Sequence, residues 1–410
     1  MIIVKVYYIL LFICCIYGAY FSISGIIGLL IKRKKFTKNR NNYNHFAIVI
    51  AARNEEAVVG NLIESLKKLD YPKDKYSIFV FPNNCNDNTS RVALDAGASV
   101  IECNIPTKSK GDVLKFAFQQ LKDNDEIDAY LVFDADNIVH SDFLLYMNDA
   151  LNKGYNVAEG FRDSKNPTDN WISGSYTLFY LFQNIFFNRA RMGINGSSSI
   201  NGTGFMISKK LIDKNGFDTY TLTEDVEFTG QCALIGEKIA FVEDAITYDE
   251  YPNMFNLSWK QRKRWSYGII QCMKRYSLKL FRNFFKTGNI ASLDMAVVYL
   301  GPLIQVFTFI TSVMFLCFNL FDVVLNDFFS YLLNSSIFLL GFAIFGVMLE
   351  CFLLMFKKKL VKGMIPGIIM FTVFLFTWIP INIICFLTKP GGWEEIKHFR
   401  NIKIEEIEKK

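Results

Sequence analysis

The sequence predicts an α/β domain that is flanked by membrane-spanning helices at both ends of the chain. Of the 410 residues, 51% are hydrophobic, and the excess lies in the first 31 residues and after about residue 290. Between these regions, short β-branched runs alternate with amphipathic segments, which is typical of a parallel sheet flanked by helices. The net charge of +6 is modest, and the basic residues lie mainly beside the apolar runs. The charge therefore does not indicate nucleic-acid binding.

The first apolar run covers residues 6–31, and about 20 such residues span a bilayer. A secretory signal peptide is the alternative, but its apolar stretch is shorter and a small-residue cleavage site follows it. Here a basic cluster follows instead, made of Lys32, Arg33, Lys34, Lys35, Lys38 and Arg40. By the positive-inside rule, residues 1–40 are expected to form a retained anchor whose C-terminal end is cytoplasmic.

Residues 41–255 are expected to form a cytoplasmic α/β domain. Residues 46–52 (FAIVIAA), 78–81 (IFVF) and 129–133 (AYLVF) are predicted strands, and residues 56–69 a helix. Ligands of parallel sheets bind at the C-terminal ends of the strands. Polar clusters follow these strands at 53–56, 83–89 and 134–137, so a binding site is expected at this edge.

The remainder is predicted to be largely membrane-associated. We expect interfacial helices over 256–290, three apolar spans within 291–388 (about 293–320, 328–356 and 364–387) and a charged tail over 389–410. Lysines between the second and third spans indicate a cytoplasmic loop, whereas Asp322 and Asp327 between the first two indicate the outside. Three spans would leave the tail outside, although its lysines favour the inside. Either one span is re-entrant, near Gly301-Pro302, or the glutamates of the tail neutralise it enough to lie outside.

Two acidic motifs have the composition of a reaction centre. Asp134-Ala135-Asp136 follows a predicted strand, where two carboxylates can hold a divalent cation that neutralises a diphosphate. The alternative is a solvated acidic turn. Thr223-Glu224-Asp225 can supply a base, or can simply be the N-cap and first turn of a helix.

A third motif is the run QRKRW over residues 261–265. Gln261, Arg264 and Trp265 fall at i, i+3 and i+4, on one face of a helix. Arginine can bind phosphate oxygens in bidentate fashion, and a Trp ring can stack on a sugar. The alternative is a basic helix that lies on the membrane surface.

The order of these motifs resembles the membrane-bound family 2 glycosyltransferases, which include the hyaluronan, chitin-oligosaccharide, cellulose and poly-N-acetylglucosamine synthases. The matching segments are IAARNEE (50–56), NNCNDNT (83–89), KSKG (108–111), FDAD (133–136), NGTGFMIS (201–208), TED (223–225) and QRKRW (261–265). The resemblance implies a GT-A domain, of the nucleotide-diphospho-sugar transferase type, with a mixed, mostly parallel sheet. It also implies an inverting transfer of N-acetylglucosamine or glucose from a nucleotide-sugar donor, expected to be a UDP-sugar, to a growing glycan at the membrane.

The resemblance also implies roles for individual residues. The donor nucleotide and its diphosphate would contact Ala52, Arg53, Asn54, Glu55, Asn83, Asp87, Lys110, Asp134, Gln261, Arg264 and Trp265. Asp136, helped by Asp134, would bind Mg²⁺ or Mn²⁺. Asp225, with Glu224 beside it, would be the general base, and the acceptor would lie near Gly202, Thr203, Gly204 and Trp265.

One position departs from the family pattern. Relatives usually carry Asp where this chain has Asn83, which can still hydrogen-bond but has no charge; Asp87 lies close enough in sequence to share its role. The departure weakens the assignment of uridine as the base.

Two other functions are also considered. One is the addition of a single sugar to a lipid-linked acceptor, and the other is a non-enzymatic membrane component that binds a nucleotide or a glycan. The aromatic segment 171–191 either lines an acceptor channel or packs against the membrane-proximal helices.

Overall fold

The computed structural model describes residues 2–323, 348–349, 351–355, 361–391, 402 and 404–408. Its α/β domain is built on an eight-stranded sheet of order β3-β2-β1-β4-β7-β6-β8-β5. The strands are β1 (Phe46–Ala52), β2 (Tyr76–Pro82), β3 (Ser99–Val100), β4 (Ala129–Asp134), β5 (Ile138–Val139), β6 (Val157–Ser164), β7 (Phe205–Ser208) and β8 (Ile239–Asp249). Pairs β1–β2, β1–β4, β2–β3 and β6–β8 are parallel, and β4–β7, β6–β7 and β5–β8 are antiparallel. The predicted mixed, mostly parallel sheet and its three predicted strands are confirmed.

The central strand β1 is apolar on both faces because both faces of the sheet are covered. Successive side chains of a strand point to opposite faces. Ile48 and Ile50 accordingly lie in one core cluster with Leu62 of helix α2, whereas Val49 lies in a second cluster with Leu114 of helix α4. The uninterrupted run FAIVIAA is what such a doubly buried strand requires.

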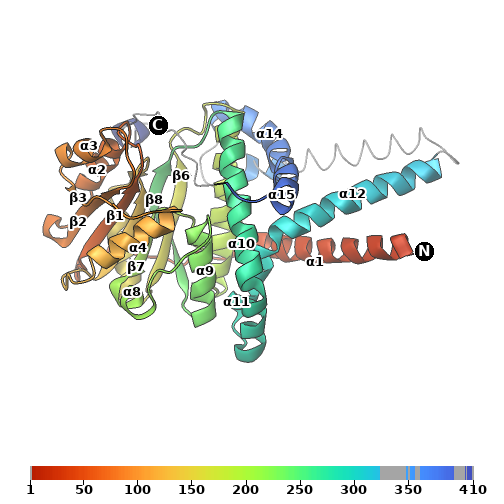
Figure 1. Ribbon diagram of the computed structural model, residues 1–410, viewed down its shortest axis with the longest axis horizontal. Helices are drawn as coiled ribbons and strands as arrows, with labels where there is room; N and C mark the ends of the chain where they lie inside the picture. The colour runs from red at the N-terminus through yellow and green to blue at the C-terminus, as the bar shows by residue number, and fades with distance from the viewer. Residues whose placement is uncertain are drawn as a thin grey trace.

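Helices pack on both faces of the sheet (Figure 1). They are α2 (Val59–Lys67), α3 (Thr89–Asp95), α4 (Lys110–Gln120), α5 (Phe143–Asn152), α6 (Trp171–Phe182), α7 (Ala190–Gly193), α8 (Lys209–Asn215) and α9 (Glu224–Ile235), with the 3₁₀ turn η1 (Lys73–Lys75) and the π-helical segment η2 (Gln183–Arg189). In the parallel register, Ala52 is opposite Pro82 and Ala51 is opposite Asp134. The C-terminal ends of β1, β2 and β4 therefore meet at one edge, as predicted.

In the part of the chain that the structure describes, three helices are long and apolar enough to cross a membrane: Ile2–Leu30, Gly301–Phe318 and Lys362–Leu387. Of these, α1 (Ile2–Leu30) and α12 (Gly301–Val323) project together from the domain (Figure 1). The C-terminal half of α1 is packed on the domain, and its glycines allow the backbones to meet. A Cβ atom at Gly28 would lie 2.2 Å from the carbonyl oxygen of Ile185.

The stretch predicted as one span over 293–320 consists of two helices. The long helix α10 (Phe255–Thr287) is followed by α11 (Ile290–Tyr299), and the chain then bends at Leu300 into α12. Asp294 of α11 is buried and accepts hydrogen bonds from Arg191 at 2.5 and 2.7 Å. This buried ion pair holds α11 on the domain, so that only α12 continues outward.

The third predicted span also packs on the domain. It comprises η3 (Lys362–Met364), α14 (Ile365–Phe376) and α15 (Trp378–Leu387), and α14 contacts α6 while α15 contacts α10. A Cβ atom at Gly174 of α6 would lie 3.0 Å from Cα of Gly367, so these two helices touch through glycine. The predicted span over 328–356 lies outside the described residues except for 348–349 and 351–355, which are helical.

The described part of the tail returns to the α/β domain. It forms α16 (Ile404–Glu408), where Glu405 pairs with Lys68 at the end of α2. Helix α16 accordingly lies beside α2 and α3 in Figure 1. Whether one span is re-entrant or the tail lies outside stays a prediction.

Candidate active site

A cavity of about 400 Å³ opens at the edge where β1, β2 and β4 end. Of the residues that the sequence singled out, those lining it are Ala52, Arg53, Glu55, Asn83, Lys110, Asp134, Asp136, Gly202, Glu224, Asp225, Gln261, Arg264 and Trp265. Four others are not among the lining residues: Asn54, Asp87, Thr203 and Gly204. Segments separated by more than 200 residues in the chain thus contribute to one site.

Asn83 is held by both ends of its carboxamide. Its Nδ2 donates to the carbonyl of Cys103 at 3.0 Å, and its Oδ1 accepts from the hydroxyl of Thr107 at 2.6 Å. An aspartate could not make the first bond, because a carboxylate has no hydrogen to donate to a carbonyl. The local loop structure therefore explains the asparagine at this position.

Asn54 and Asp87 brace the loops behind the cavity. Asn54 accepts from the backbone N–H of Asn86 at 2.8 Å, and Asp87 accepts from the N–H of Glu56 at 3.1 Å and of Thr89 at 3.0 Å. Burial raises the pKa of Asp87, but these hydrogen bonds outweigh it and leave the pKa lowered. Both side chains join the loops after β1 and β2, and a direct role in donor binding stays a prediction.

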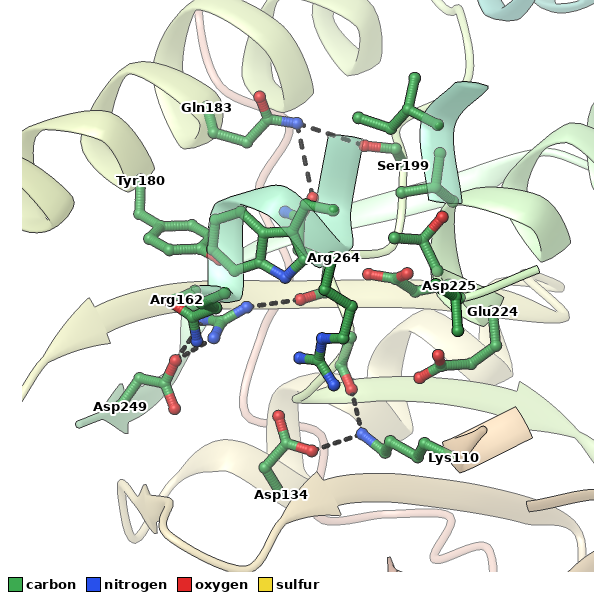
Figure 2. A pocket seen from close by; sticks show the side chains of 18 of the residues that line it. Lys110, Asp134, Arg162, Tyr180, Gln183, Ser199, Glu224, Asp225, Asp249 and Arg264 are labelled. Atoms are coloured by element: carbon green, nitrogen blue, oxygen red, sulfur yellow. Dashed lines mark hydrogen bonds and ion pairs between the residues drawn. The ribbon is translucent and has the colours of Figure 1, made fainter. Parts of the chain in front are cut away.

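Lys110 lies at the first residue of α4, where a capping box of Ser109 and Asp112 fixes the start of the helix. Its ammonium donates to the carboxylate of Asp134 and, at 2.7 Å, to the carbonyl of Gly202 (Figure 2). Burial raises the pKa of Asp134, but the charges of Lys110 and Arg162 more than offset burial, so that the pKa is lowered. Asp134 is therefore an anion at neutral pH.

The loop over 201–204 joins the two sides of the cavity. Gly202 has φ +88°, and a Cβ atom there would lie 3.2 Å from Oδ2 of Asp225, so a larger residue would crowd this carboxylate. Thr203 is buried, and its hydroxyl accepts from the backbone N–H of Asp134 at 2.9 Å. Gly204 packs against Thr247 instead of facing the cavity. Thr203 thus positions Asp134, whereas Gly202 is the member of the loop that lines the cavity.

Glu224 and Asp225 occupy the first turn of α9, as the helix-start alternative predicted, and both also line the cavity. Burial, followed by the neighbouring Asp225 carboxylate, raises the pKa of Glu224 to about 7. Burial also raises the pKa of Asp225. A carboxylate whose pKa is raised toward neutrality is suited to accept a proton.

The QRKRW run divides between two environments on α10. Gln261, Arg264 and Trp265 face the cavity, and Nε of Arg264 is buried with no hydrogen-bond partner among the described residues. Arg262 is fully buried on another side of the helix, where its guanidinium donates to the carbonyl of Phe374 at 3.0 Å and to the hydroxyl of Thr377 at 2.5 Å. A helix that only rested on the membrane surface would not bury Arg262 or direct Arg264 into an internal cavity.

Trp265 lies in a group of aromatic rings at the cavity wall. It stacks on Trp378 and Phe179, with ring centroids 6.2 and 6.5 Å apart. Phe179 belongs to the aromatic segment predicted over 171–191. Its helix α6 packs on α14, as one alternative predicted, and Tyr180, Gln183 and Phe187 line the cavity, whose use as an acceptor channel stays a prediction. Phe179 and Trp378 also stack on each other, at 6.1 Å, so these two rings and Trp265 form one cluster.

A buried ion pair in the site was not found from the sequence. Arg162 donates to Asp249 at 2.6 Å and to the carbonyl of Asn201 at 2.6 Å, and it stacks over the ring of Tyr180 (Figure 2). Burial raises the pKa of Asp249 to about 7 despite Arg162, and Asp136 and Asp134 contribute to the increase. Asp249 is an acid at the end of β8, the same signal that identified Asp134 at the end of β4.

The residues at the end of β4 fit a divalent cation. Mg²⁺ is commonly held by one or two carboxylates together with substrate phosphates. Asp134 and Asp136 both line the cavity, and no third His, Cys, Asp or Glu among the described residues completes a metal-binding group with them. Such a pair suits a metal that takes its remaining ligands from a diphosphate.

The family model described as "Glycosyltransferase like family 2" matches residues 44–268, more than half of the chain. The chain is a family 2 glycosyltransferase. The match contains β1, the Asp134–Asp136 turn, the first turn of α9 and the QRKRW run, and the resemblance inferred from these motifs is confirmed.

Several curated proteins are similar to this glycosyltransferase. The probable glycosyltransferase YdaM of Bacillus subtilis (strain 168) is 28% identical over 62% of this chain and 60% of that protein. The beta-monoglucosyldiacylglycerol synthase of Trichormus variabilis is 26% identical over 55% of this chain and 49% of that protein. The poly-beta-1,6-N-acetyl-D-glucosamine synthase of Staphylococcus epidermidis is 21% identical over 63% of this chain and 64% of that protein. The glycosyltransferase thus matches between about half and two thirds of the length of these relatives.

A solved structure agrees with the fold. The mannosyltransferase PcManGT from Pyrobaculum calidifontis, in complex with GDP-Man and Mn²⁺, aligns with a TM-score of 0.56 over 92% of this chain and 98% of that chain. Sequence identity is 12%, so this similarity concerns the fold. The predicted GT-A class is confirmed.

Proposed function

We propose that this glycosyltransferase transfers glucose or N-acetylglucosamine from a UDP-sugar to an acceptor hydroxyl at the cytoplasmic face of a membrane, with inversion. The observation that carries the proposal is the meeting of two anionic groups, Asp134 and Asp225, with the cationic groups Lys110 and Arg264 in one cavity. The names of the glucosyl- and N-acetylglucosamine-transferring relatives support the choice of sugar. The basic cluster that follows α1 supports a cytoplasmic domain.

The donor diphosphate would lie between Lys110 and Arg264. The unpartnered Nε of Arg264 is a donor available to a phosphate oxygen, and charge-assisted bonds of this kind are the strong ones. Asp134 and Asp136 would hold Mg²⁺ or Mn²⁺, and the GT-A neighbour in complex with Mn²⁺ supports a divalent ion. The metal would supply positive charge against the charge that develops on the leaving diphosphate.

Asp225 would remove the proton of the acceptor hydroxyl as that oxygen attacks the anomeric carbon. Its raised pKa makes it a stronger base than an exposed aspartate, and Gly202 leaves space beside its Oδ2. Glu224, whose pKa is about 7, lies next to it and would limit the negative charge at this end of the cavity. Arg162, held by Asp249, would fix the carbonyl of Asn201 and thus the loop that carries Gly202.

The test is an incubation of the purified full chain in lipid with UDP-glucose, UDP-N-acetylglucosamine and GDP-mannose, with nucleotide release and product mass as readouts. Release from a UDP-sugar is expected, and Asp225→Asn should abolish transfer. Asp218→Asn is the matched control, because Asp218 pairs with Lys115 near the surface. Nucleotide release from GDP-mannose alone would show that uridine is the wrong nucleobase for the donor. No release from any donor would exclude the proposed enzyme activity.

A further inference from the structure

The cavity is lined by side chains of two kinds. Besides the charged residues of the proposed donor site, the lining includes a group of apolar and aromatic side chains, here called the apolar part: Tyr17, Phe21, Phe187, Val226, Met295 and Val298. Tyr17 and Phe21 belong to α1, which is long and apolar enough to span a membrane. A helix that serves as a membrane anchor therefore also forms part of the wall of the reaction cavity.

We propose that the acceptor is a membrane lipid with an uncharged hydroxyl head group, which enters between α1 and α11 and presents its hydroxyl to Asp225. This inference rests on the proposed glycosyl transfer and names its acceptor class. It differs from the growing glycan that the sequence favoured.

The apolar part of the cavity begins next to the proposed base. Val226 follows Asp225 in α9, and its carbonyl accepts a hydrogen bond from the hydroxyl of Tyr299 in α11 at 2.7 Å. This bond fixes α11 against the turn that carries Asp225, so Val298 lies close to the reacting end. A lipid chain in this part of the cavity would hold its head group at Asp225.

The far end of the apolar part lies where the projecting helices leave the domain. A Cβ atom at Gly301, the first residue of α12, would lie 3.0 Å from the hydroxyl of Tyr17. Because Tyr17 lines the cavity, the cavity wall reaches the level at which α12 begins, and Figure 1 shows α1 and α12 projecting together from the domain. If these helices enter a bilayer, this level is the head-group region, from which a lipid can enter sideways.

A buried hydrogen-bond network joins α1 to α11 beside the cavity. Asp294 of α11 accepts hydrogen bonds from Tyr20 of α1 and from Arg191, and Arg191 and Asp294 are 4% and 6% exposed. Arg191 and Asp294 pair with each other and lie outside the cavity lining, so their charges do not face the apolar part of the cavity. Breaking such a buried pair is costly, which keeps the two helices at a fixed separation.

The charges near Asp225 select the type of head group. A hydroxyl can donate a hydrogen bond to a carboxylate, whereas a phosphate monoester would be repelled by the carboxylate of Asp225. A hydrophilic glycan chain running along Phe21 and Val298 would leave its hydroxyls unpaired, at about 1–3 kcal/mol for each buried group. An uncharged lipid alcohol avoids both costs.

The reaction balances without another reactant. The lipid oxygen forms a bond to the anomeric carbon as the bond from that carbon to the diphosphate oxygen breaks. The bonding electrons leave with the nucleoside diphosphate, and the hydroxyl proton passes to Asp225. The products are one glycosylated lipid and one nucleoside diphosphate.

The experiment uses the full chain in phosphatidylglycerol nanodiscs with UDP-[¹⁴C]glucose or UDP-[¹⁴C]N-acetylglucosamine. Discs with 1,2-dioleoylglycerol are compared with discs that contain a polyprenyl phosphate and with plain discs given a soluble chito-oligosaccharide. We expect label in the organic phase with dioleoylglycerol, at a mass of lipid plus sugar. Label that appears mainly with the polyprenyl phosphate, or only in water-soluble product, would overturn this inference while leaving the glycosyltransferase activity intact.

Two neighbouring residues of α11 provide a matched pair of variants. Val298→Phe should fill the apolar part and reduce lipid glycosylation at least about tenfold with unchanged UDP affinity. Val297→Phe lies one position along the helix and outside the cavity lining, and it should change the rate of lipid glycosylation less than about twofold. Phe21→Ala, which removes bulk without adding any, should raise the KM for the lipid and leave UDP affinity unchanged. Equal effects of the two valine variants would contradict the lipid route, and no nucleotide release under any condition would exclude the transferase proposal itself.

Discussion

The ammonium group of Lys110 links the carboxylate of Asp134 directly to the loop at Gly202. Burial lowers the pKa of Lys110, but the charges of Asp134 and Glu224 outweigh burial and raise it. One lysine therefore balances acidic groups on both sides of the cavity. If Asp134 held a divalent cation, the ammonium of Lys110 would be available to a donor diphosphate.

We predict that the metal binds cooperatively with the nucleotide, because Asp134 and Asp136 supply two ligands and Lys110 competes for one of them. Mn²⁺ affinity, measured by the EPR signal of free Mn²⁺, should be at least about tenfold higher with UDP than without it. Asp136→Asn should abolish both metal binding and transfer. Lys110→Met should strengthen Mn²⁺ binding in the absence of UDP while impairing transfer. Full transfer in excess chelator would exclude a metal role.

Asp225→Asn should lower the rate of transfer by about 10²- to 10⁴-fold, the usual loss on removing a general base. UDP affinity, measured by calorimetry, should be almost unchanged because this residue acts on the acceptor. A variant that loses UDP affinity but retains turnover would assign Asp225 to the donor.

The rate should also depend on pH. The base acts when deprotonated, and burial raises the pKa of Asp225, so activity should rise with pH over a range above that of an exposed aspartate and then level off. The measurement is kcat/KM between about pH 5 and 8.5. Because Glu224 and Asp225 interact, the apparent pKa values of this profile belong to the pair of carboxylates. A rate that is flat over this range would contradict proton removal by this carboxylate.

Glu224→Gln should stabilise the protein at alkaline pH. The folded-state pKa of Glu224, about 7, lies above its ordinary value of 4.5, so the folded state holds a proton that the unfolded state releases. Its contribution therefore becomes more unfavourable as pH rises from about 4.5 to 7. The variant should show a higher Tm than wild type at pH 8 and no gain at pH 4.5. Glu126→Gln, at an exposed site, is the control and should give no pH-dependent difference in Tm.

Substitutions in QRKRW should separate catalysis from folding. Arg264→Lys and Trp265→Ala should strongly impair transfer with little change in Tm, because a point charge does not replace a bidentate fork on a diphosphate. Lys263→Ala should be mild in both assays. Arg262→Ala should lower Tm, because it leaves the partners of a buried guanidinium unsatisfied. Equal, mild losses of transfer in the Lys263, Arg264 and Trp265 variants would instead support a membrane-surface helix.

The predictable parts of the site depend on local patterns. The turn after β4 and the first turn of α9 follow from residues adjacent in sequence, and the helical spacing of Gln261, Arg264 and Trp265 places them on one face. Arg162 and Asp249 meet only because β6 and β8 pair in parallel across 87 positions of sequence, which no local pattern encodes. The bend at Leu300 was not predicted either, because the apolar sequence continues through it. The contact that holds α11 on the domain joins Asp294 to Arg191, which is 103 positions away in sequence.

The contact of Gly28 with the backbone at Ile185 makes the first helix a structural part of the enzyme. Replacing α1 with an unrelated apolar helix of equal length and hydropathy would bring larger side chains against the backbone at Ile185. It would also remove Tyr17 and Phe21 from the cavity wall. A soluble truncation that begins after Leu30 would likewise expose the apolar surface of η2. Helix α1 and the catalytic domain are therefore not exchangeable modules, and reconstitution or chimera studies need to retain the native pair.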